Sequence, residues 1–201
     1  MEDKKQQTIN TYNKTASLMA EKFNGLGVRV GDIKETFELI SKINPFVLEI
    51  GCGNGRDATE IIKYTNNYIG LDIADKFIEI AKENVPNGKF EVADIENYIF
   101  PNNLDVVFAF ASLIHVQKDN LRMIFKNIYN SLNKNGVVRI SMKYSDIYKE
   151  VVKEDEFGIR TYYFYSDEDI KELAKDFLVI KSERNELRNQ IWLEVLLQKN
   201  H

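Results

Sequence analysis

The residues that could do chemistry gather in a glycine-rich stretch in the first third of the chain. Glu49 stands two positions before Gly51, and Gly53 and Gly55 follow at alternate positions. Glycine has no Cβ, so it allows a tight turn and lets the backbone approach a ligand closely. The mostly apolar residues 46–50 precede this stretch, and apolar residues at helical spacing follow it. A strand, a glycine turn and a helix start direct unpaired backbone N–H groups to one point, which predicts a nucleotide-like ligand.

An acidic residue near the end of the next apolar segment supports this prediction. Residues 68–73 are expected to form a strand, and Asp72 lies near its end. An acid about 20 residues after the glycines is where such folds bind ribose hydroxyls. Its carboxylate can accept two hydrogen bonds, one from the 2′-OH and one from the 3′-OH group. The alternative role, a cap of the next helix, suits Asp75 better.

These motifs resemble those of a known family. The order Glu49-x-Gly51-x-Gly53-x-Gly55 is similar to the first motif of the class I S-adenosylmethionine-dependent methyltransferases. The Leu-Asp-Ile segment that contains Asp72 resembles the second motif of that family. The dinucleotide fingerprint needs its third glycine one residue later, which argues against NAD. The resemblance implies S-adenosyl-L-methionine as the cofactor.

The resemblance also implies contacts outside the glycine stretch. Asp94 follows the third expected strand, where an acid of the family binds the adenine amino group, and the backbone of Ile95 meets the ring. Tyr12 lies in a Tyr-Asn-Lys-x-Ala pattern that is similar to a lid over the methionine end of the cofactor. The complete set of expected cofactor-binding residues is Tyr12, Glu49, Gly51, Gly53, Gly55, Arg56, Asp72, Ile73, Phe77, Asp94, Ile95 and Ala111.

Several of these residues have a purely structural alternative. Tyr12 and Phe77 also fit as core residues of amphipathic helices, and Asp94 also fits as a turn aspartate. Arg56, at a helix start, either pairs with the carboxylate of the cofactor or is solvated. Cys52 is interpreted as a small filler rather than a nucleophile, because no histidine lies near it in sequence.

His115 is the candidate catalytic residue. A sulfonium methyl group is already activated, so the protein has to align an acceptor and, where needed, remove a proton. His115 follows the expected strand 104–110, at the edge where open α/β sheets bind ligands, and an imidazole can serve as a general base. The alternative is that His115 only packs the loop through backbone hydrogen bonds. His201, at the C-terminus, is expected to lie on the surface.

Two missing patterns narrow the acceptor. The segment after strand 104–110 reads Phe-Ala-Ser-Leu and lacks the Asx-Pro-Pro-aromatic signature that the family's amino methyltransferases of bases or glutamine show. No acidic cluster that would hold a divalent metal is visible, so no metal site is expected. We therefore expect an enzyme that moves a methyl group to a small-molecule oxygen or nitrogen acceptor. The alternatives are a non-catalytic S-adenosylmethionine-binding protein and another nucleotide-cofactor transferase on the same fold.

The elements that must position these residues form an α/β pattern. An amphipathic helix over residues 9–23 and a glycine-containing hinge predict an N-terminal lid, residues 1–31, ahead of a single methyltransferase domain, residues 32–201. Expected strands lie at 46–50, 68–73, 89–92, 104–110, 137–142, 177–183 and 190–198. Helices separate the first five strands, and the last two form an antiparallel hairpin. The fold class is a doubly wound, Rossmann-like sheet of seven mostly parallel strands whose last strand is antiparallel.

Composition restricts the partners and the compartment. The 201 residues suit one domain with a substantial core. A net charge of −4 disfavours nucleic acid as a partner, and no apolar run reaches the roughly 20 residues of a membrane span. The charged start has no following apolar core for export, and the single cysteine, Cys52, cannot form an internal disulfide. We expect a cytoplasmic protein, and the sequence leaves its oligomeric state open.

Overall fold

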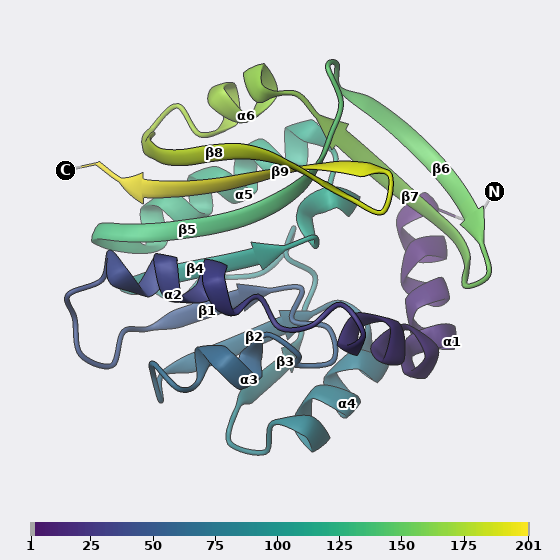
Figure 1. Cartoon of the computed structure of the whole chain (residues 1–201), viewed down its shortest axis with the longest axis horizontal. Coiled ribbons are helices and arrows are strands. Elements are labelled where there is room, and N and C mark those ends of the chain that lie inside the picture. Colours follow the sequence, from purple (N-terminus) through teal and green to yellow (C-terminus); the bar gives the residue numbers. More distant parts are fainter. Residues whose placement is uncertain (1–2, 201) are drawn as a thin grey trace.

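Figure 1 shows the computed structural model of the chain, which describes residues 3–200. Met1, Glu2 and His201 lie outside the described residues. His201 was expected on the surface, and the two expected domains begin at residue 1 and end at residue 201. These positions lie outside the described part of the chain.

A nine-stranded sheet runs through the middle of the molecule (Figure 1). Its first five strands lie in the order β3-β2-β1-β4-β5, and all neighbours among them are parallel. Every residue of β1 and β4 is buried, as their nearly continuous apolar sequences predict for central strands. The strands are β1 (Val47–Ile50), β2 (Tyr68–Asp72), β3 (Lys89–Val92), β4 (Leu104–Phe110), β5 (Leu132–Tyr144), β6 (Lys149–Asp155), β7 (Gly158–Tyr165), β8 (Phe177–Leu187) and β9 (Gln190–Lys199).

Helices cover both faces of the sheet. Residues of α2, α3 and α4 share one buried apolar cluster with the sheet, and residues of α5 and α6 share the other. This arrangement confirms the doubly wound, Rossmann-like class expected from the sequence. The helices are α1 (Lys4–Asn24), α2 (Val30–Glu38), α3 (Ala58–Ile61), α4 (Asp75–Asn84), the 3₁₀ helix η1 (Leu113–His115), α5 (Lys118–Ser131) and α6 (Asp167–Leu173).

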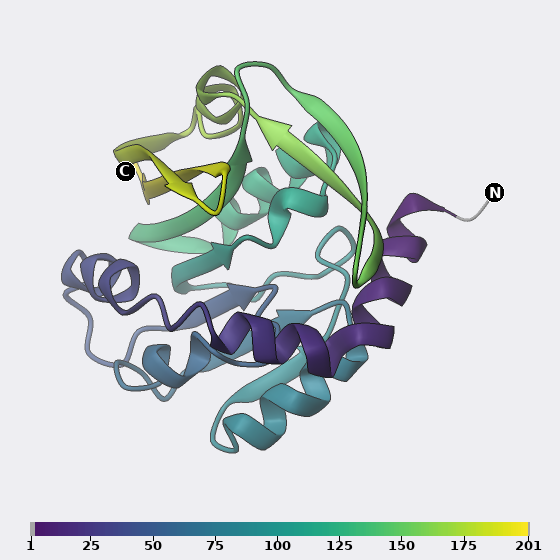
Figure 2. The ribbon, with the colours of Figure 1, turned by 45° about the vertical axis from the view of Figure 1, so that its right-hand side comes forward.

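The sheet divides at β5, and this division is the main departure from the expected seven strands. Antiparallel β9 pairs with β5 over residues 137–143, and β8 pairs with the outer side of β9. Parallel β7 pairs with β5 only at Lys143 and Tyr144 and carries antiparallel β6 on its other side. Residues 143–157 are highly charged and show no clear strand pattern, yet they contain β6. The β6–β7 hairpin lies beside α1 (Figure 2), where the Thr11 hydroxyl donates to the Ile159 carbonyl at 2.7 Å.

Some local expectations are corrected by the structure. Asp32 does not cap α2; it lies in the first turn, and its carboxylate pairs with the buried Arg139 of β5. Ile43 lies beyond the end of α2 and is 94% exposed. Ser166 and Asp169 form a capping box at the start of α6. No helix among residues 3–200 combines the length and the apolar character that a membrane crossing requires.

Candidate functional site

A cavity of about 560 Å³ opens at the carboxyl ends of β1, β2 and β4, between the sheet, α1 and β7. Open parallel sheets bind their ligands at this edge because the chain leaves it in loops that side chains and backbone N–H groups line. All but one of the thirteen residues predicted for the site line this cavity. The exception is Gly55.

The absence of a side chain has a different structural consequence at each of the three glycines of the loop. Gly51, at φ +72°, lies so close to the Ser112 side chain that a Cβ would stand 2.1 Å from the Cβ of Ser112. A Cβ on Gly55 would meet Ala81 and Val85, at 3.3 Å each, so this glycine allows α4 to pack closely rather than lining the cavity. Gly53, at φ +54°, would meet nothing within 4 Å. Only Gly53 therefore leaves open space beside the backbone at the cavity.

Asp72 ties the glycine loop to the start of α4. One carboxylate oxygen accepts from Gly53 N and the other from Ala74 N, both at 2.9 Å. The expected cap by Asp75 is not formed: α4 has no side-chain cap hydrogen bond, and Asp75 lies in its first turn. Each oxygen keeps a further lone pair for a ligand hydroxyl. Burial raises the pKa of Asp72 to about 6, while the backbone hydrogen bonds lower it.

Glu49 lies at the floor of the cavity and is 2% exposed. The Tyr68 hydroxyl donates to its Oε2. Burial, followed by the charge of Asp57, raises the pKa of Glu49 to about 8. A cation bound beside it would favour the ionised carboxylate, so Glu49 is suited to a ligand that carries positive charge.

Helix α1 covers the cavity and meets the residues that were predicted to bind the cofactor. Lys5 pairs with Asp94 at 2.7 Å and with Glu96 at 2.9 Å. The Tyr12 ring lies 5.9 Å from the Phe77 ring. Phe77 is buried in an apolar cluster, the partly buried Tyr12 packs against that cluster, and both side chains also line the cavity. The two interpretations of Tyr12 and Phe77, core residue and ligand contact, are thus compatible.

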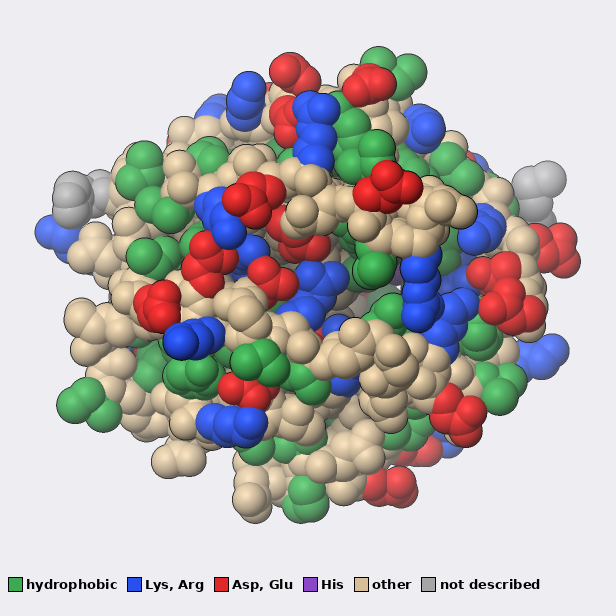
Figure 3. Space-filling view, in the orientation of Figure 1, with side chains coloured by type: hydrophobic (Ala, Val, Ile, Leu, Met, Phe, Trp, Pro, Cys, Tyr) green, Lys and Arg blue, Asp and Glu red, His purple; other side chains and the backbone are tan. Residues whose placement is uncertain are grey.

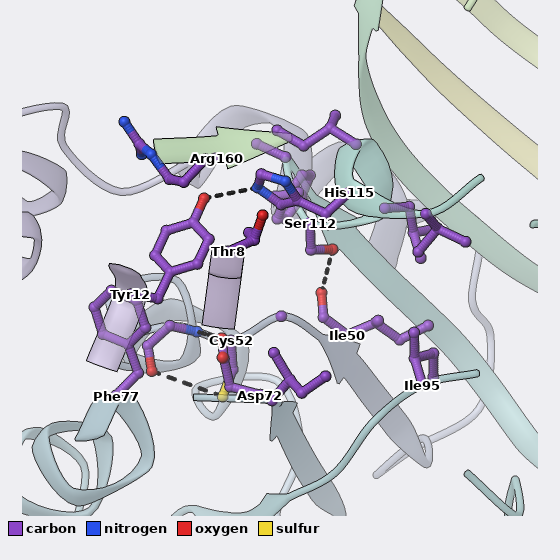
Figure 4. A pocket seen from close by; sticks show the side chains of 18 of the residues that line it. Thr8, Tyr12, Ile50, Cys52, Asp72, Phe77, Ile95, Ser112, His115 and Arg160 are labelled. Atoms are coloured by element: carbon purple, nitrogen blue, oxygen red, sulfur yellow. Dashed lines mark hydrogen bonds between the residues drawn. The ribbon is translucent and has the colours of Figure 1, made fainter. Parts of the chain in front are cut away.

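Tyr12, His115 and β7 form a chain of hydrogen bonds (Figure 4). His115 Nδ1 lies 2.6 Å from the Thr161 carbonyl, so Nδ1 carries the proton and Nε2 accepts from the Tyr12 hydroxyl, 2.7 Å away. Burial, together with the charges of Arg160 and Lys143, lowers the pKa of His115 to about 4. The imidazole is therefore neutral at pH 7, and its Nε2 lone pair faces α1, where it accepts from Tyr12.

The remaining predicted residues surround the glycine loop. Arg56 neither stands free in solvent nor points an unpaired charge into the cavity: it pairs with Asp57 and donates to the Phe23 carbonyl at 3.3 Å. Ala111 follows β4 with a positive φ of 51°, an unusual conformation for a residue with a Cβ. Its N–H donates to Ser141 Oγ at 2.9 Å. Ile73 and Ile95 line the cavity as half-buried side chains.

Sequence reasoning missed most of the opposite wall of the cavity. Lys143, Arg160 and Trp192 come from β5, β7 and β9 and line the cavity with Tyr162 and Tyr163. Only the tyrosines are marked by the sequence: Tyr162, Tyr163 and Tyr165 fit either the wall of an acceptor pocket or the ordinary filling of a strand. Cys52 lines the cavity too, but burial raises the pKa of its thiol well above the usual range, which agrees with a filler role. Among residues 3–200, no cluster of His, Cys, Asp and Glu could hold a metal ion.

Comparison with known proteins identifies the domain. A family model described as a methyltransferase domain matches residues 47–136. Malonyl-[acyl-carrier protein] O-methyltransferase 1 of Ilyobacter polytropus is 31% identical over 140 residues, which cover 67% of this chain and 47% of that protein. The chain spans about half or less of the length of the curated relatives it matches.

Solved structures show the same fold. A S-adenosylmethionine-dependent methyltransferase of Clostridium acetobutylicum has a TM-score of 0.71 at 14% identity, covering 94% of this chain and 99% of that one. The 1,6-didemethyltoxoflavin-N1-methyltransferase of Burkholderia thailandensis, solved with 1,6-didemethyltoxoflavin and S-adenosylhomocysteine, has a TM-score of 0.70 at 16% identity, covering 96% and 88%. At these identities the likeness concerns the fold.

Proposed function

The chain belongs to the class I S-adenosylmethionine-dependent methyltransferase family, and on this basis we propose that it binds S-adenosyl-L-methionine and transfers its methyl group to an oxygen or nitrogen atom of a small molecule. The observation that carries the proposal is the convergence of Glu49, Gly53, Asp72, Asp94 and the candidate base His115 on one cavity.

The residues present fit this cofactor. S-adenosylmethionine carries ribose hydroxyls, an adenine amino group and a cationic amino acid end. Asp72 supplies acceptors for the hydroxyls, Asp94 for the amino group, and buried Glu49 stands where positive charge would be stabilised. The open space at Gly53 leaves the backbone accessible, since a side chain there would fill the cavity.

The protein's part in the reaction is alignment and proton removal. When bound, the cofactor supplies an electrophilic methyl group, so no protein nucleophile is needed. His115 holds a neutral Nε2 at the carboxyl end of β4, and the Tyr12 hydroxyl occupies that lone pair when no acceptor is present. An acceptor hydroxyl that takes the place of Tyr12, or donates through it, would pass its proton to Nε2.

A small acceptor fits the covered cavity better than a macromolecule does. Helix α1 and the β6–β7 hairpin lie across the carboxyl edge of the sheet and are held together at Thr11 and Thr8. The names of other matched relatives specify phosphoethanolamine, a sterol carbon and a tRNA nucleotide as targets. Because these targets differ, we infer the kind of acceptor from the site and not from those names. We keep nucleic acid as a disfavoured partner and the cytoplasm as the expected compartment.

The N-terminal part would act as a lid. Residues 1–31, as far as they are described, contain α1 and the turn at Gly25 and Gly27, and they contact the cavity at Lys5 and Tyr12. Lys5 occupies the carboxylate of Asp94 that the adenine would use. Cofactor entry therefore requires this ion pair to open or to shift.

The test is cofactor binding followed by turnover. S-adenosylhomocysteine should saturate the protein in calorimetry and raise its melting temperature, whereas NAD should do neither. A panel of small alcohols, phenols, acids and amines with radiolabelled methyl donor then identifies the acceptor. Absence of S-adenosylhomocysteine binding by folded protein would overturn the proposal. Binding without turnover on any acceptor would favour the non-catalytic alternative.

A further inference from the structure

Lys143 lies in an aromatic cage where the sheet divides. Its register partners are Phe164 on β7 and Trp192 on β9, so two strands that leave β5 in different directions place rings beside one lysine. The Lys143 Nζ is 4.9 Å from the Tyr162 ring centre, 5.0 Å from that of Trp192 and 5.3 Å from that of Phe164. Three rings thus hold one cation at the wall of the cavity.

This cation lacks an acidic partner. Its polar contact is Gln190 Oε1 at 3.2 Å, and among the described residues no carboxylate oxygen lies within 4 Å of the Lys143 Nζ. Partial burial and then the charges of Lys153 and Arg160 lower its pKa to about 8. Buried cations are normally paired with an anion, because removing charge from water is costly. Here the aromatic faces offset only part of that cost.

The neighbouring strand adds polar atoms that the protein does not use. Arg160, 7% exposed, pairs with Asp155 through Nη2, but its buried Nε has no hydrogen-bond partner. The buried hydroxyl of Thr161, 4% exposed, has none either, and both residues line the cavity. Asp155 compensates the charge of Arg160, so Lys143 is the uncompensated charge at this wall.

We infer that the acceptor carries an oxyanion, a carboxylate or a phosphate-type group, which pairs with Lys143. This inference rests on the proposed function and names its substrate class. The Tyr162 ring also lies 4.8 Å from the ring of His115. One ring therefore separates the anion position at Lys143 from the candidate base.

A cationic acceptor fits this wall poorly. An aromatic cage attracts ammonium groups, but here Lys143 already occupies the ring faces. A second cation would add repulsion from Lys143 and Arg160. In Figure 3, Lys and Arg side chains gather beside a hollow in the surface near the tip of the β8–β9 hairpin. Positive charge gathered beside this hollow would attract anionic molecules.

The only tryptophan of the chain reports on this position directly. Protein saturated with S-adenosylhomocysteine is titrated with benzoate, phenylphosphonate and the neutral analogue benzamide, and Trp192 fluorescence is followed. We expect a saturable change with at least one anion and about tenfold weaker binding of benzamide. Lys143→Gln should weaken anion binding about tenfold or more and leave S-adenosylhomocysteine affinity unchanged, because Lys143 lies on the opposite wall from the glycine loop.

Lys149→Gln is the matched control. Its Nζ also lies over the Phe164 ring, at 5.0 Å, but the residue does not line the cavity, so the variant should bind both anions like the parent protein. Lys143→Arg keeps the charge and should retain anion binding within a few-fold. This variant shows whether the weaker binding of Lys143→Gln comes from the lost charge or from a disturbed fold. The ratio of benzoate to phenylphosphonate affinity identifies the oxyanion.

Two results would overturn the inference: benzamide binding as tightly as both anions, or Lys143→Gln binding the anions like the parent protein. Either would reduce Lys143 to a support for its aromatic neighbours. Failure of the proposed function is distinguishable, since it would appear in the same samples as absent S-adenosylhomocysteine binding before any anion is added.

Discussion

The Tyr12 hydroxyl lies 2.7 Å from Nε2 of His115, although the two residues are 103 positions apart in the chain. One belongs to the helix that covers the cavity, and the other follows the central strand β4. The proton on Nδ1 is fixed by the Thr161 carbonyl, so this contact uses the lone pair that a general base needs. A displacement of α1 that breaks this contact would therefore expose the candidate base.

His115→Ala should separate chemistry from cofactor binding. If the acceptor is a hydroxyl, kcat should fall by roughly 10²–10⁴-fold, because proton removal is lost. S-adenosylhomocysteine affinity should barely change, since the predicted ribose and adenine contacts lie elsewhere. Tyr12→Phe is the companion variant: it keeps the ring packing on Phe77 and frees Nε2. Near-normal turnover of His115→Ala would reduce His115 to a packing residue.

The pH–rate profile should lack a limb at the ordinary histidine pKa. A histidine with an ordinary pKa would give a limb near pH 6–7. Burial lowers the pKa of His115 to about 4, so activity that depends on the neutral imidazole should stay level from pH 8 to 6 and fall only towards pH 4. The profile of kcat/KM on one accepted substrate tests this. A limb near pH 6.5 that disappears in His115→Ala would contradict the burial argument but support the base.

Asp72→Ala should weaken S-adenosylhomocysteine binding by about 1.5–3 kcal/mol, the usual scale for hydrogen bonds to a charged group. The carboxylate also accepts from Gly53 N and Ala74 N, so the unliganded melting temperature should fall as well. Comparing adenosine with 2′,3′-dideoxyadenosine isolates the ribose contribution. If Asp72→Ala loses as much affinity for 2′,3′-dideoxyadenosine as for adenosine, Asp72 does not bind the ribose hydroxyls and only maintains the conformation of the loop.

Alanine at Gly51 and at Gly53 should have different effects. A Cβ at Gly51 would stand 2.1 Å from the Ser112 Cβ, so Gly51→Ala should lower the melting temperature strongly. At Gly53 nothing stands within 4 Å, and Gly53→Ala should cost only about 1–2 kcal/mol for the left-handed backbone. Gly53→Val should abolish S-adenosylhomocysteine binding while the protein stays folded. Equal losses of stability at both positions would refute this distinction.

Glu49→Gln should change how stability depends on pH. The folded pKa of Glu49 is raised to about 8 from an ordinary 4.5, so between these values the folded protein holds a proton that the unfolded chain has released. Glu49 therefore stabilises less as pH rises through this window, by at most about 1.4 kcal/mol per pH unit. The melting temperature of Glu49→Gln relative to the parent should rise from pH 5 to pH 8. A melting-temperature difference that stays constant from pH 5 to pH 8 would mean that the folded protein does not raise the pKa of Glu49.

The lid should respond to the cofactor. Amide hydrogen exchange around Tyr12 should slow when S-adenosylhomocysteine is added, because the bound ligand would add contacts beneath α1. Lys5→Gln removes the ion pair with Asp94 and should speed exchange in the unliganded protein. Lys14→Gln, on an exposed position of the same helix, is the control. Unchanged exchange on ligand addition would make α1 a fixed packing element.

The sequence by itself determined the fold class and the cofactor side of the cavity. Glu49, the glycines and Asp72 lie in continuous strand–turn–helix segments, and parallel strands bring their carboxyl ends to one edge whatever the rest of the chain does. Local periodicity is enough to predict such segments. It was not enough for Gly55, whose neighbour is α4, or for Arg56, whose partners are Asp57 and the end of α1.

Only the tertiary structure decided the wall of the cavity that we propose for the acceptor. Lys143, Tyr162 and Trp192 belong to three strands that meet because β5 pairs with β9 along most of its length and with β7 at its end. The sequence of β6 does not predict a strand, because β6 is mostly exposed and lacks the apolar alternation of a half-buried strand. Pairing between distant strands is set by packing of the whole sheet, and no local pattern of residues encodes it.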